Sequence, residues 1–288
     1  MDEFNPFERL RANWTLVARR VSAARSRQPP VDWRRVGLIV AGGLALVVFV
    51  GLLYDARVIA WTRTEPGSVR SFFAWTTRFG QSDWLLTPTG LIVIIVAFSD
   101  CRRVSRVHAA AWWEIATTAG LLYVLVTVSG LVADIIKPIA GRFRPDFVEH
   151  GAFAFAPFTF GGYPHYSFPS GHATTMAAVA ILVAFVPSII TAPVVIAAAI
   201  VAISRVMIDA HFPSDVVGGA LIGLGVGYVI LGVAARAGIV FAKREDGSLR
   251  GRVGVLRRLS RRPGGLVGLL PALWIALGGR RPPQPPPT

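Results

Sequence analysis

The chain has 288 residues, of which 53% are hydrophobic and only 16% are charged, and its mean hydropathy is +0.54. A soluble globular chain carries roughly a quarter of its residues as Asp, Glu, Lys or Arg, so this composition excludes intrinsic disorder and an ordinary soluble enzyme as the main body. The single cysteine, Cys101, excludes a disulfide-stapled scaffold. Several apolar runs reach the roughly 17–25 residues that cross a bilayer. The sequence therefore predicts an integral membrane protein.

The basic charge is concentrated at the two ends of the chain. There are 30 Lys and Arg against 16 Asp and Glu, a net charge of +14, and 19 of the 30 lie in residues 1–35 and 236–288. Such flanking charge is typical of cytoplasmic segments that contact anionic lipid headgroups. A nucleic-acid surface would instead interleave basic and aromatic residues, so we predict no nucleic-acid partner.

Six apolar segments lie between the basic ends. The first is uninterrupted, whereas the second is short and contains Thr87-Pro88-Thr89. A tight turn at Pro187-Ser188 separates the fourth from the fifth, and the sixth is rich in glycine, which permits close helix packing in lipid. The predicted spans are 36–54, 86–99, 112–136, 172–188, 190–208 and 215–235.

These spans predict an all-α integral membrane protein with both ends on one side. The predicted organisation is a basic cytoplasmic N-terminal tail (1–35), a six-span domain (36–235) and a basic, proline-rich cytoplasmic C-terminal tail (236–288). Because an even number of spans returns the chain to its starting side, the positive tails make that side cytoplasmic. The loops at 55–85, 137–171 and 209–214 then face outward.

Three short polar clusters fall at this outer face. They are Lys137 to Arg144-Pro145, then Pro169-Ser170-Gly171-His172, and then Ser204-Arg205 with His211 and Asp215. A purely structural membrane protein has little reason to keep such groups beside its spans. Their convergence at one membrane face predicts a shared site.

The clusters offer groups that bind an anion. Lys137, Arg144 and Arg205 supply cations, and the planar fork of arginine matches phosphate oxygens. Ser170 and Gly171 precede a predicted helix, where free backbone N–H groups and the positive end of the helix dipole favour an anion. Together these groups predict a phosphate-binding site.

The same clusters offer two imidazoles and a carboxylate. His211 and Asp215 are four residues apart and share a face if the stretch is helical. A carboxylate on one imidazole nitrogen fixes the tautomer and leaves the other nitrogen free to attack, and His172 can donate a proton. These groups predict phosphoryl transfer without a metal ion.

Each motif alone has a simpler interpretation. Pro-Ser-Gly-His by itself is typical of a helix N-terminus with Ser170 as its cap. A His and Asp four apart are usually an ordinary pair on a helix face, and Lys or Arg at a membrane boundary usually reaches toward headgroups. The combination favours a functional site.

The combination resembles the phosphatidic acid phosphatase type 2 family. The motifs of that family read Lys-x6-Arg-Pro, Pro-Ser-Gly-His and Ser-Arg-x5-His-x3-Asp, and all eleven fixed positions agree here in order and spacing. The resemblance covers about residues 86–235 and does not explain the two tails.

The resemblance implies a six-span helical phosphatase core and a phosphohistidine mechanism with neither a metal ion nor another cofactor. His211 would be the nucleophile, Asp215 its orienting partner and His172 the proton donor to the leaving oxygen. The residues implied to hold the phosphate are Lys137, Arg144, Ser170, Gly171 and Arg205.

The implied substrate is a lipid phosphate at the outer, periplasmic face of a bacterial inner membrane. Undecaprenyl diphosphate is our first expectation, with phosphatidylglycerophosphate, phosphatidate and lipid A phosphate as alternatives. A six-span transporter and a catalytically silent lipid-binding scaffold are the non-enzyme alternatives. The sequence does not determine the oligomeric state.

Four neighbouring features carry their own expectations. We expect Arg142 to be a solvated loop arginine, with phosphate contact as the alternative, and Asp209 to be a loop carboxylate rather than a group that tunes the site. Asp134 lies one helical turn from Lys137, which predicts an ion pair. The aromatic residues of loop 147–168 fit either an interfacial belt or a mouth for a lipid chain.

Overall fold

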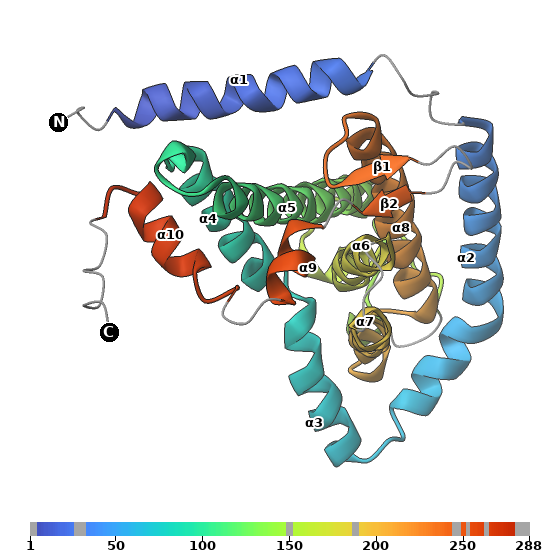
Figure 1. Ribbon diagram of the computed structural model, residues 1–288. Helices are drawn as coiled ribbons and strands as arrows, with labels where there is room; N and C mark the ends of the chain where they lie inside the picture. Colours follow the sequence, from blue (N-terminus) through green and yellow to red (C-terminus); the bar gives the residue numbers. More distant parts are fainter. Residues whose placement is uncertain are drawn as a thin grey trace. The chain divides into compact units, whose positions relative to one another are not determined.

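The structure, a computed structural model, describes residues 5–25, 33–147, 152–185, 190–243, 249–251, 254–261 and 265–279. These ranges are predominantly helical, with one short antiparallel strand pair (Figure 1). In chain order the elements are α1 (Pro6–Arg25), α2 (Trp33–Thr62), α3 (Gly67–Thr76), η1 (Thr77–Gly80), α4 (Asp83–Phe98), η2 (Cys101–Arg103), α5 (Arg106–Ala140), η3 (Pro145–Phe147), η4 (Tyr163–His165), α6 (Gly171–Phe185), α7 (Thr191–Met207), α8 (Pro213–Arg236), β1 (Phe241–Lys243), β2 (Leu249–Gly251), α9 (Val255–Ser260) and α10 (Leu269–Ala276).

Four helical segments among the described residues are long and apolar enough to cross a membrane. They are Val36–Thr62, Gly67–Phe98, Arg106–Ala140 and Pro213–Arg236. The prediction of a helical membrane protein is confirmed, and the one strand pair, β1 with β2, lies after the last predicted span. Helices α6 and α7 have 15 and 17 residues, or roughly 22 and 25 Å at 1.5 Å per residue. Both are shorter than a bilayer core of about 30 Å, so six spans stay a prediction, and the expected turn at 187–188 lies outside the described residues.

The expected outer loop at 55–85 is wrong in large part, because this segment is mainly helical. Helix α2 continues to Thr62, eight residues beyond the predicted end of its span, and α3 follows after a short turn. The segments 58–61 and 69–75 are rich in apolar and aromatic residues, of which Trp61, Phe72 and Trp75 are more than half exposed. Such side chains suit a helix at the membrane boundary better than a hydrated loop. Figure 1 shows α2 and α3 joined at an angle.

The chain divides into two compact units. The smaller unit comprises residues 1–29, 87–121 and 234–288, and the larger comprises 30–86 and 122–233. In the smaller unit the C-terminal helices pack on the first half of α5, where Trp112 Nε1 donates to the Leu269 carbonyl at 2.9 Å and Glu114 accepts from the Val255 N–H at 2.9 Å. The predicted domain boundaries at 35 and 236 stay a prediction.

In the larger unit, glycines on α8 allow that helix to lie against α6. An added Cβ at Gly219 would approach the Ser170 carbonyl to 2.3 Å, and one at Gly223 would approach the Thr174 carbonyl to 2.4 Å. Small residues let helix backbones come this close, as the glycine-rich sixth segment predicts. The packing of α6 on α8 brings the second and third sequence clusters together.

Candidate functional site

The first cluster enters the larger unit where α5 ends. Gly141 has a left-handed φ of +58°, and its N–H donates to the Lys137 carbonyl at 2.8 Å, closing the last turn. An added Cβ at Gly141 would lie 1.8 Å from the Ala156 carbonyl oxygen, so glycine is required by both the turn and the close approach. The turn directs Arg142 and Arg144 into the protein, where both are buried.

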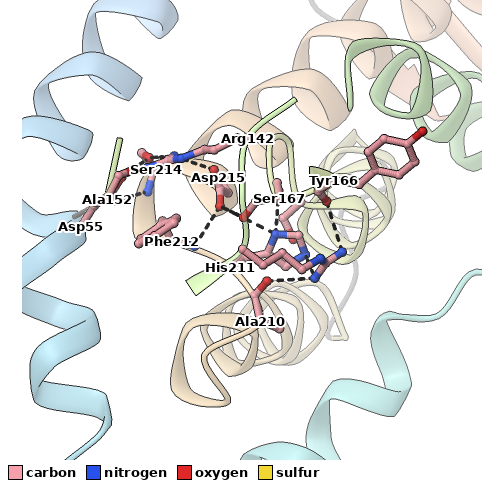
Figure 2. A network of polar contacts seen from close by, with 12 residues as sticks. Asp55, Arg142, Ala152, Tyr166, Ser167, Ala210, His211, Phe212, Ser214 and Asp215 are labelled. Atoms are coloured by element: carbon pink, nitrogen blue, oxygen red, sulfur yellow. Dashed lines mark hydrogen bonds and ion pairs between the residues drawn. The ribbon is translucent and has the colours of Figure 1, made fainter. Parts of the chain in front are cut away.

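The second and third clusters meet at the N-termini of α6 and α8. The Ser170 N–H donates to the Asp215 carbonyl at 3.0 Å, and His211 Nδ1 lies 2.7 Å from the Ser167 carbonyl (Figure 2). His211 and Asp215 are buried at 2% and 0% exposure. The predicted convergence of the clusters is therefore present in the folded chain.

The His211 imidazole is held in one tautomer. A carbonyl oxygen can only accept, so Nδ1 carries the hydrogen that it donates to Ser167, and Nε2 keeps its lone pair. Arg144 Nη1, a donor, lies 3.3 Å from Nε2. Burial lowers the pKa of His211 to about 4, against the opposing effect of Asp215. The ring is therefore neutral near pH 7, and its unprotonated Nε2 faces Arg144 Nη1.

Asp215 is saturated with hydrogen bonds. Its Oδ2 accepts from the Ser167 hydroxyl at 2.5 Å and the Phe212 N–H at 2.8 Å, and its Oδ1 accepts from Arg142 Nη1 at 2.6 Å. His211 Nδ1 is 3.8 Å from Oδ2, too long for a hydrogen bond. Ser167 therefore links the two expected partners, since its hydroxyl contacts Asp215 and its carbonyl contacts His211.

Arg144 is anchored beside the free nitrogen of His211. Its Nη1 donates to the Ala210 carbonyl at 2.8 Å and its Nε to the Tyr163 carbonyl at 2.9 Å, while Nη2 reaches the Tyr166 carbonyl at 3.2 Å. Burial lowers the pKa of Arg144 below its ordinary value, yet guanidinium stays charged in proteins. A fixed cation thus stands next to the atom that would attack.

Two polar atoms of the predicted phosphate site are buried and lack a hydrogen-bond partner among the described residues. They are Ser170 Oγ and Arg205 Nε. Arg205 is held at its other end, where Nη1 donates to Thr77 Oγ1 at 2.7 Å. The interpretation of Ser170 as a helix cap through its side chain is wrong, because its hydroxyl makes no such bond. Buried polar groups normally find partners, so these two atoms point to a bound anion.

The two remaining residues of the predicted site are His172 and Lys137. An added Cβ at Gly80 would lie 2.4 Å from His172 Cδ2, which shows that η1 packs directly on this imidazole. Lys137 Nζ forms the predicted ion pair with Asp134, at 2.6 Å, and lies 3.4 Å from an added Cβ at Gly171. The first and second clusters are therefore adjacent as well.

One expectation about the neighbouring residues is wrong. Arg142 is not a solvated loop arginine, because its side chain is 3% exposed and pairs with both Asp55 and Asp215 at 2.6 Å. Asp209 lies in the loop between α7 and α8, as expected. It is buried there, accepts from Thr62 Oγ1 at 2.5 Å and pairs with Arg70 at 2.6 Å.

Sequence reasoning missed the groups that α2 and η1 contribute. Asp55 and Thr77 both fall in the segment that we expected to be an outer loop, and Ser214 was passed over within the third cluster. One signal was available for Asp55. It directly follows an uninterrupted apolar run, where an acidic residue is costly and usually functional.

The aromatic loop exposes several rings. Phe153, Phe155, Phe158 and Phe160 are between 48% and 84% exposed, whereas the ring of Tyr163 stacks on Arg144, 3.9 Å from Cζ to the ring centroid. The belt and the lipid mouth both fit exposed rings, so both interpretations stay open.

The chain is similar to known proteins over most of its length. The PAP2 superfamily model matches residues 117–238. Curated relatives include a lipid A 1-phosphatase of Rhizobium johnstonii, 32% identical over 83% of this chain and 96% of that protein, and one of Rhizobium etli, 33% identical over 76% and 92%. A crystal structure described as the first transmembrane PAP2 type phosphatidylglycerolphosphate phosphatase, from Bacillus subtilis, matches at 21% identity and a TM-score of 0.49, over 68% of this chain and 94% of that one.

Proposed function

The chain belongs to the PAP2 superfamily and is a membrane lipid phosphatase, and we propose that it removes the 1-phosphate of lipid A through a phosphohistidine intermediate. One observation carries the mechanism: the unprotonated Nε2 of a neutral His211 lies 3.3 Å from Arg144 Nη1, in a site with two buried polar atoms that lack partners among the described residues. The names of both curated relatives support the choice of lipid. Undecaprenyl diphosphate, our first expectation from the sequence, has no observation in its favour over lipid A.

In the first step, His211 Nε2 attacks the phosphorus atom. The new N–P bond forms as the bond from phosphorus to the lipid oxygen breaks. His172, which must take up a second proton when the phosphate dianion binds, gives that proton to the lipid oxygen. Water then attacks the phosphohistidine and transfers a proton to His172, the N–P bond breaks, and inorganic phosphate leaves. Both histidines end in their starting states.

The phosphate oxygens would be held by groups from all three clusters. Arg144 and Arg205 supply fixed cations and Lys137 a third, which stabilise the charge on the transferring group. Ser170 Oγ would donate its hydroxyl hydrogen, together with backbone N–H groups at the start of α6, including that of Gly171. Asp215 would stabilise the positive charge that develops on the imidazole as the N–P bond forms.

We further propose that the site faces the periplasm and that residues 1–35 and 236–288 are cytoplasmic at the inner membrane. The basic ends support this orientation, and exposed Phe7 and Trp14 on basic helix α1 suit the lipid headgroup region. A reporter fused after Ala242 should behave as cytoplasmic and one inserted near Ala154 as external. The opposite behaviour of either fusion would contradict the orientation.

The function is tested by a panel of lipids in detergent micelles. Purified protein should release phosphate fastest from lipid A 1-phosphate, ahead of undecaprenyl diphosphate, phosphatidylglycerophosphate and phosphatidate. A different order of rates would identify another lipid as the substrate, and release from none of them would rule out the proposed function.

Inhibitors test the metal-free mechanism. Vanadate should inhibit because it resembles the transferring phosphoryl group, whereas EDTA should not. Loss of activity in EDTA with recovery in Mg²⁺ would overturn the metal-free mechanism.

A further inference from the structure

A chain of buried charges lies behind the reacting groups. Asp55 on α2, Arg142 after α5 and Asp215 on α8 are 0%, 3% and 0% exposed. Arg142 Nη2 lies 2.6 Å from Asp55 Oδ2, and Nη1 lies 2.6 Å from Asp215 Oδ1 (Figure 2). One guanidinium therefore joins two carboxylates that come from helices far apart in the sequence.

The other contacts of Arg142 also hold its guanidinium in place between the two carboxylates. Nη1 also donates to Ser214 Oγ at 2.7 Å, and Nη2 donates to the Ala152 carbonyl at 2.7 Å. The guanidinium lies over the Phe212 ring, 4.3 Å from Cζ to the ring centroid. With both terminal nitrogens engaged and one face covered, Arg142 is oriented toward Asp215 and away from a phosphate ligand.

Asp55 holds the same assembly from a second direction. Its Oδ1 accepts from the Ser214 N–H at 2.9 Å, and its Oδ2 accepts from the Ser214 hydroxyl at 2.5 Å. Ser214 lies in the first turn of α8, directly before Asp215. A single carboxylate of α2 therefore fixes both the arginine that contacts Asp215 and the helix turn that carries it.

We propose that Asp55 and Arg142 are positioning residues for phosphoryl transfer. By orienting Asp215, they hold Ser167 and, through the Ser167 carbonyl, the His211 tautomer whose Nε2 is free to attack. This inference rests on the proposed phosphohistidine reaction. It assigns a role in the reaction to α2, a helix outside the 117–238 segment that matches the family.

The two residues also determine the charge behind the nucleophile. Two carboxylates and one guanidinium carry a net charge of −1 when all are ionised. As the imidazole becomes positive during attack, this residual negative charge stabilises it at short range, where the surroundings are dry and electrostatic effects are strong. Without Asp55, Arg142 would neutralise Asp215 fully, and the charge behind His211 would fall to zero.

The kinetics of the variant Asp55→Asn test the proposal. This substitution keeps the shape of the side chain but removes its charge. We expect kcat on p-nitrophenyl phosphate to fall ~10–100-fold, the usual cost of losing an outer partner of a site residue, with KM within about threefold because the phosphate-binding cations are intact. Arg142→Lys keeps a charge but loses the planar fork, so it should also lose kcat. Asp100→Asn, which removes a carboxylate paired with Arg102 and Arg103 in the smaller unit, is the matched control and should keep wild-type kinetics. Unchanged kcat in Asp55→Asn, or a loss confined to KM, would overturn the proposal.

Thermal unfolding separates positioning from folding. The melting temperature of Asp55→Asn is measured alongside its kinetics, and kcat is compared with that of the wild type at a temperature where both proteins are fully folded. If Asp55 only supports the fold, kcat should match the wild-type value there. We expect kcat to stay low. A wild-type kcat in the fully folded variant would overturn the proposal.

A spectroscopic readout keeps this inference distinct from the proposed function. In ¹⁵N-histidine spectra of the full-length protein in micelles, wild-type His211 should show the Nδ1–H tautomer, and Asp55→Asn should show a mixture. If wild-type protein releases no phosphate but Asp55→Asn alters the tautomer, the proposed function fails and the positioning stands. An unaltered tautomer together with unaltered kcat would refute the positioning alone.

Discussion

The two sides of the His211 imidazole differ in how far the protein satisfies their polar atoms. Behind the ring, Asp215 accepts three hydrogen bonds and Asp55 another three, and Arg142 Nε is the one unpartnered side-chain atom of this chain of charges. On the side that we propose for the phosphate, called the front below, Ser170 Oγ and Arg205 Nε are buried without partners in the described part of the chain.

The difference separates structure from substrate binding. A buried network whose carboxylates are fully hydrogen-bonded rigidifies what it contains, whereas a buried group at a binding site that lacks a partner costs free energy until a ligand supplies one. The rear of the site is therefore built before substrate arrives, and the oxygens of a phosphate would complete the front. Changes at the rear should affect stability and turnover together, and changes at the front should affect turnover alone.

The largest effect is expected from the atom between the two sides. His211→Ala removes the attacking nitrogen, so activity should fall by roughly 10⁴-fold or more on both a lipid phosphate and an aryl phosphate. Asp215→Asn should give an intermediate rate, because the imidazole remains while its charge support is lost. Phosphate release from both substrates measures this. Substantial lipid phosphatase activity in His211→Ala would contradict the assignment.

The proton donor at the front should show a dependence on the leaving group. His172→Ala should lose about 10²–10⁴-fold on a lipid phosphate and less on p-nitrophenyl phosphate, whose phenolate leaves without needing a proton. Rates on the two substrates, compared as a ratio, give the result. Equal losses on both would assign His172 to another role, and equal rescue of both histidine variants by the aryl substrate would reverse the two roles.

The placement of His172 depends on a residue of η1. Gly80→Ala would bring a Cβ to within 2.4 Å of the imidazole and so displace it, and a displacement near 1 Å can cost roughly 10²-fold in rate. The loss should again be greater for the lipid than for the aryl substrate. Gly67→Ala is a suitable control, since an added Cβ meets no atom within 4 Å there. Wild-type rates in Gly80→Ala would mean that η1 does not position His172.

Two serines provide a direct comparison of front and rear. Ser170→Ala should lower kcat/KM by roughly 10–100-fold, the value of a hydrogen bond to a charged group. The melting temperature should not fall, because the hydroxyl has no partner among the residues that the structure describes. Ser214→Ala breaks contacts with Asp55 and Arg142 and should destabilise the fold by about 1–3 kcal/mol. Thermal unfolding and steady-state kinetics on both variants measure the contrast. A destabilised Ser170→Ala would show that its hydroxyl serves the fold.

The residues at the front of the site were largely predictable from the sequence, because each group of them lies within a few residues along the chain. The segment from Lys137 to Arg144 spans the end of α5, and His211 lies two residues before α8, whose first turn carries Asp215. The glycines of α8 mark the face that meets α6. Residues this close in sequence stay close in the folded chain, so their spacing alone predicts that they share a site. The ion pair of Asp134 with Lys137 followed from the same rule.

The rear was not predictable, because its contacts join distant segments. Whether a loop arginine is solvated depends on what lies opposite it, and the partner of Arg142 is 87 residues away on α2. The same holds for Thr77, whose bond to Arg205 spans 128 residues. Ending the first span at residue 54 removed Asp55 from its helix and hid the connection.

The smallest expected effect is a loss of folding stability in acid, and it follows from the burial of His211. Burial lowers its pKa to about 4, from 6.5 in the unfolded chain. Between these values the unfolded state binds a proton that the folded state does not, so stability should decline as pH falls from 6.5 toward 4, by about 2 kcal/mol at pH 5. The variant His211→Gln lacks this group and should lose less stability over the same range. Melting temperatures of the two proteins from pH 7 to pH 5 measure the difference, and parallel curves would mean that His211 titrates normally and is not kept neutral by its surroundings.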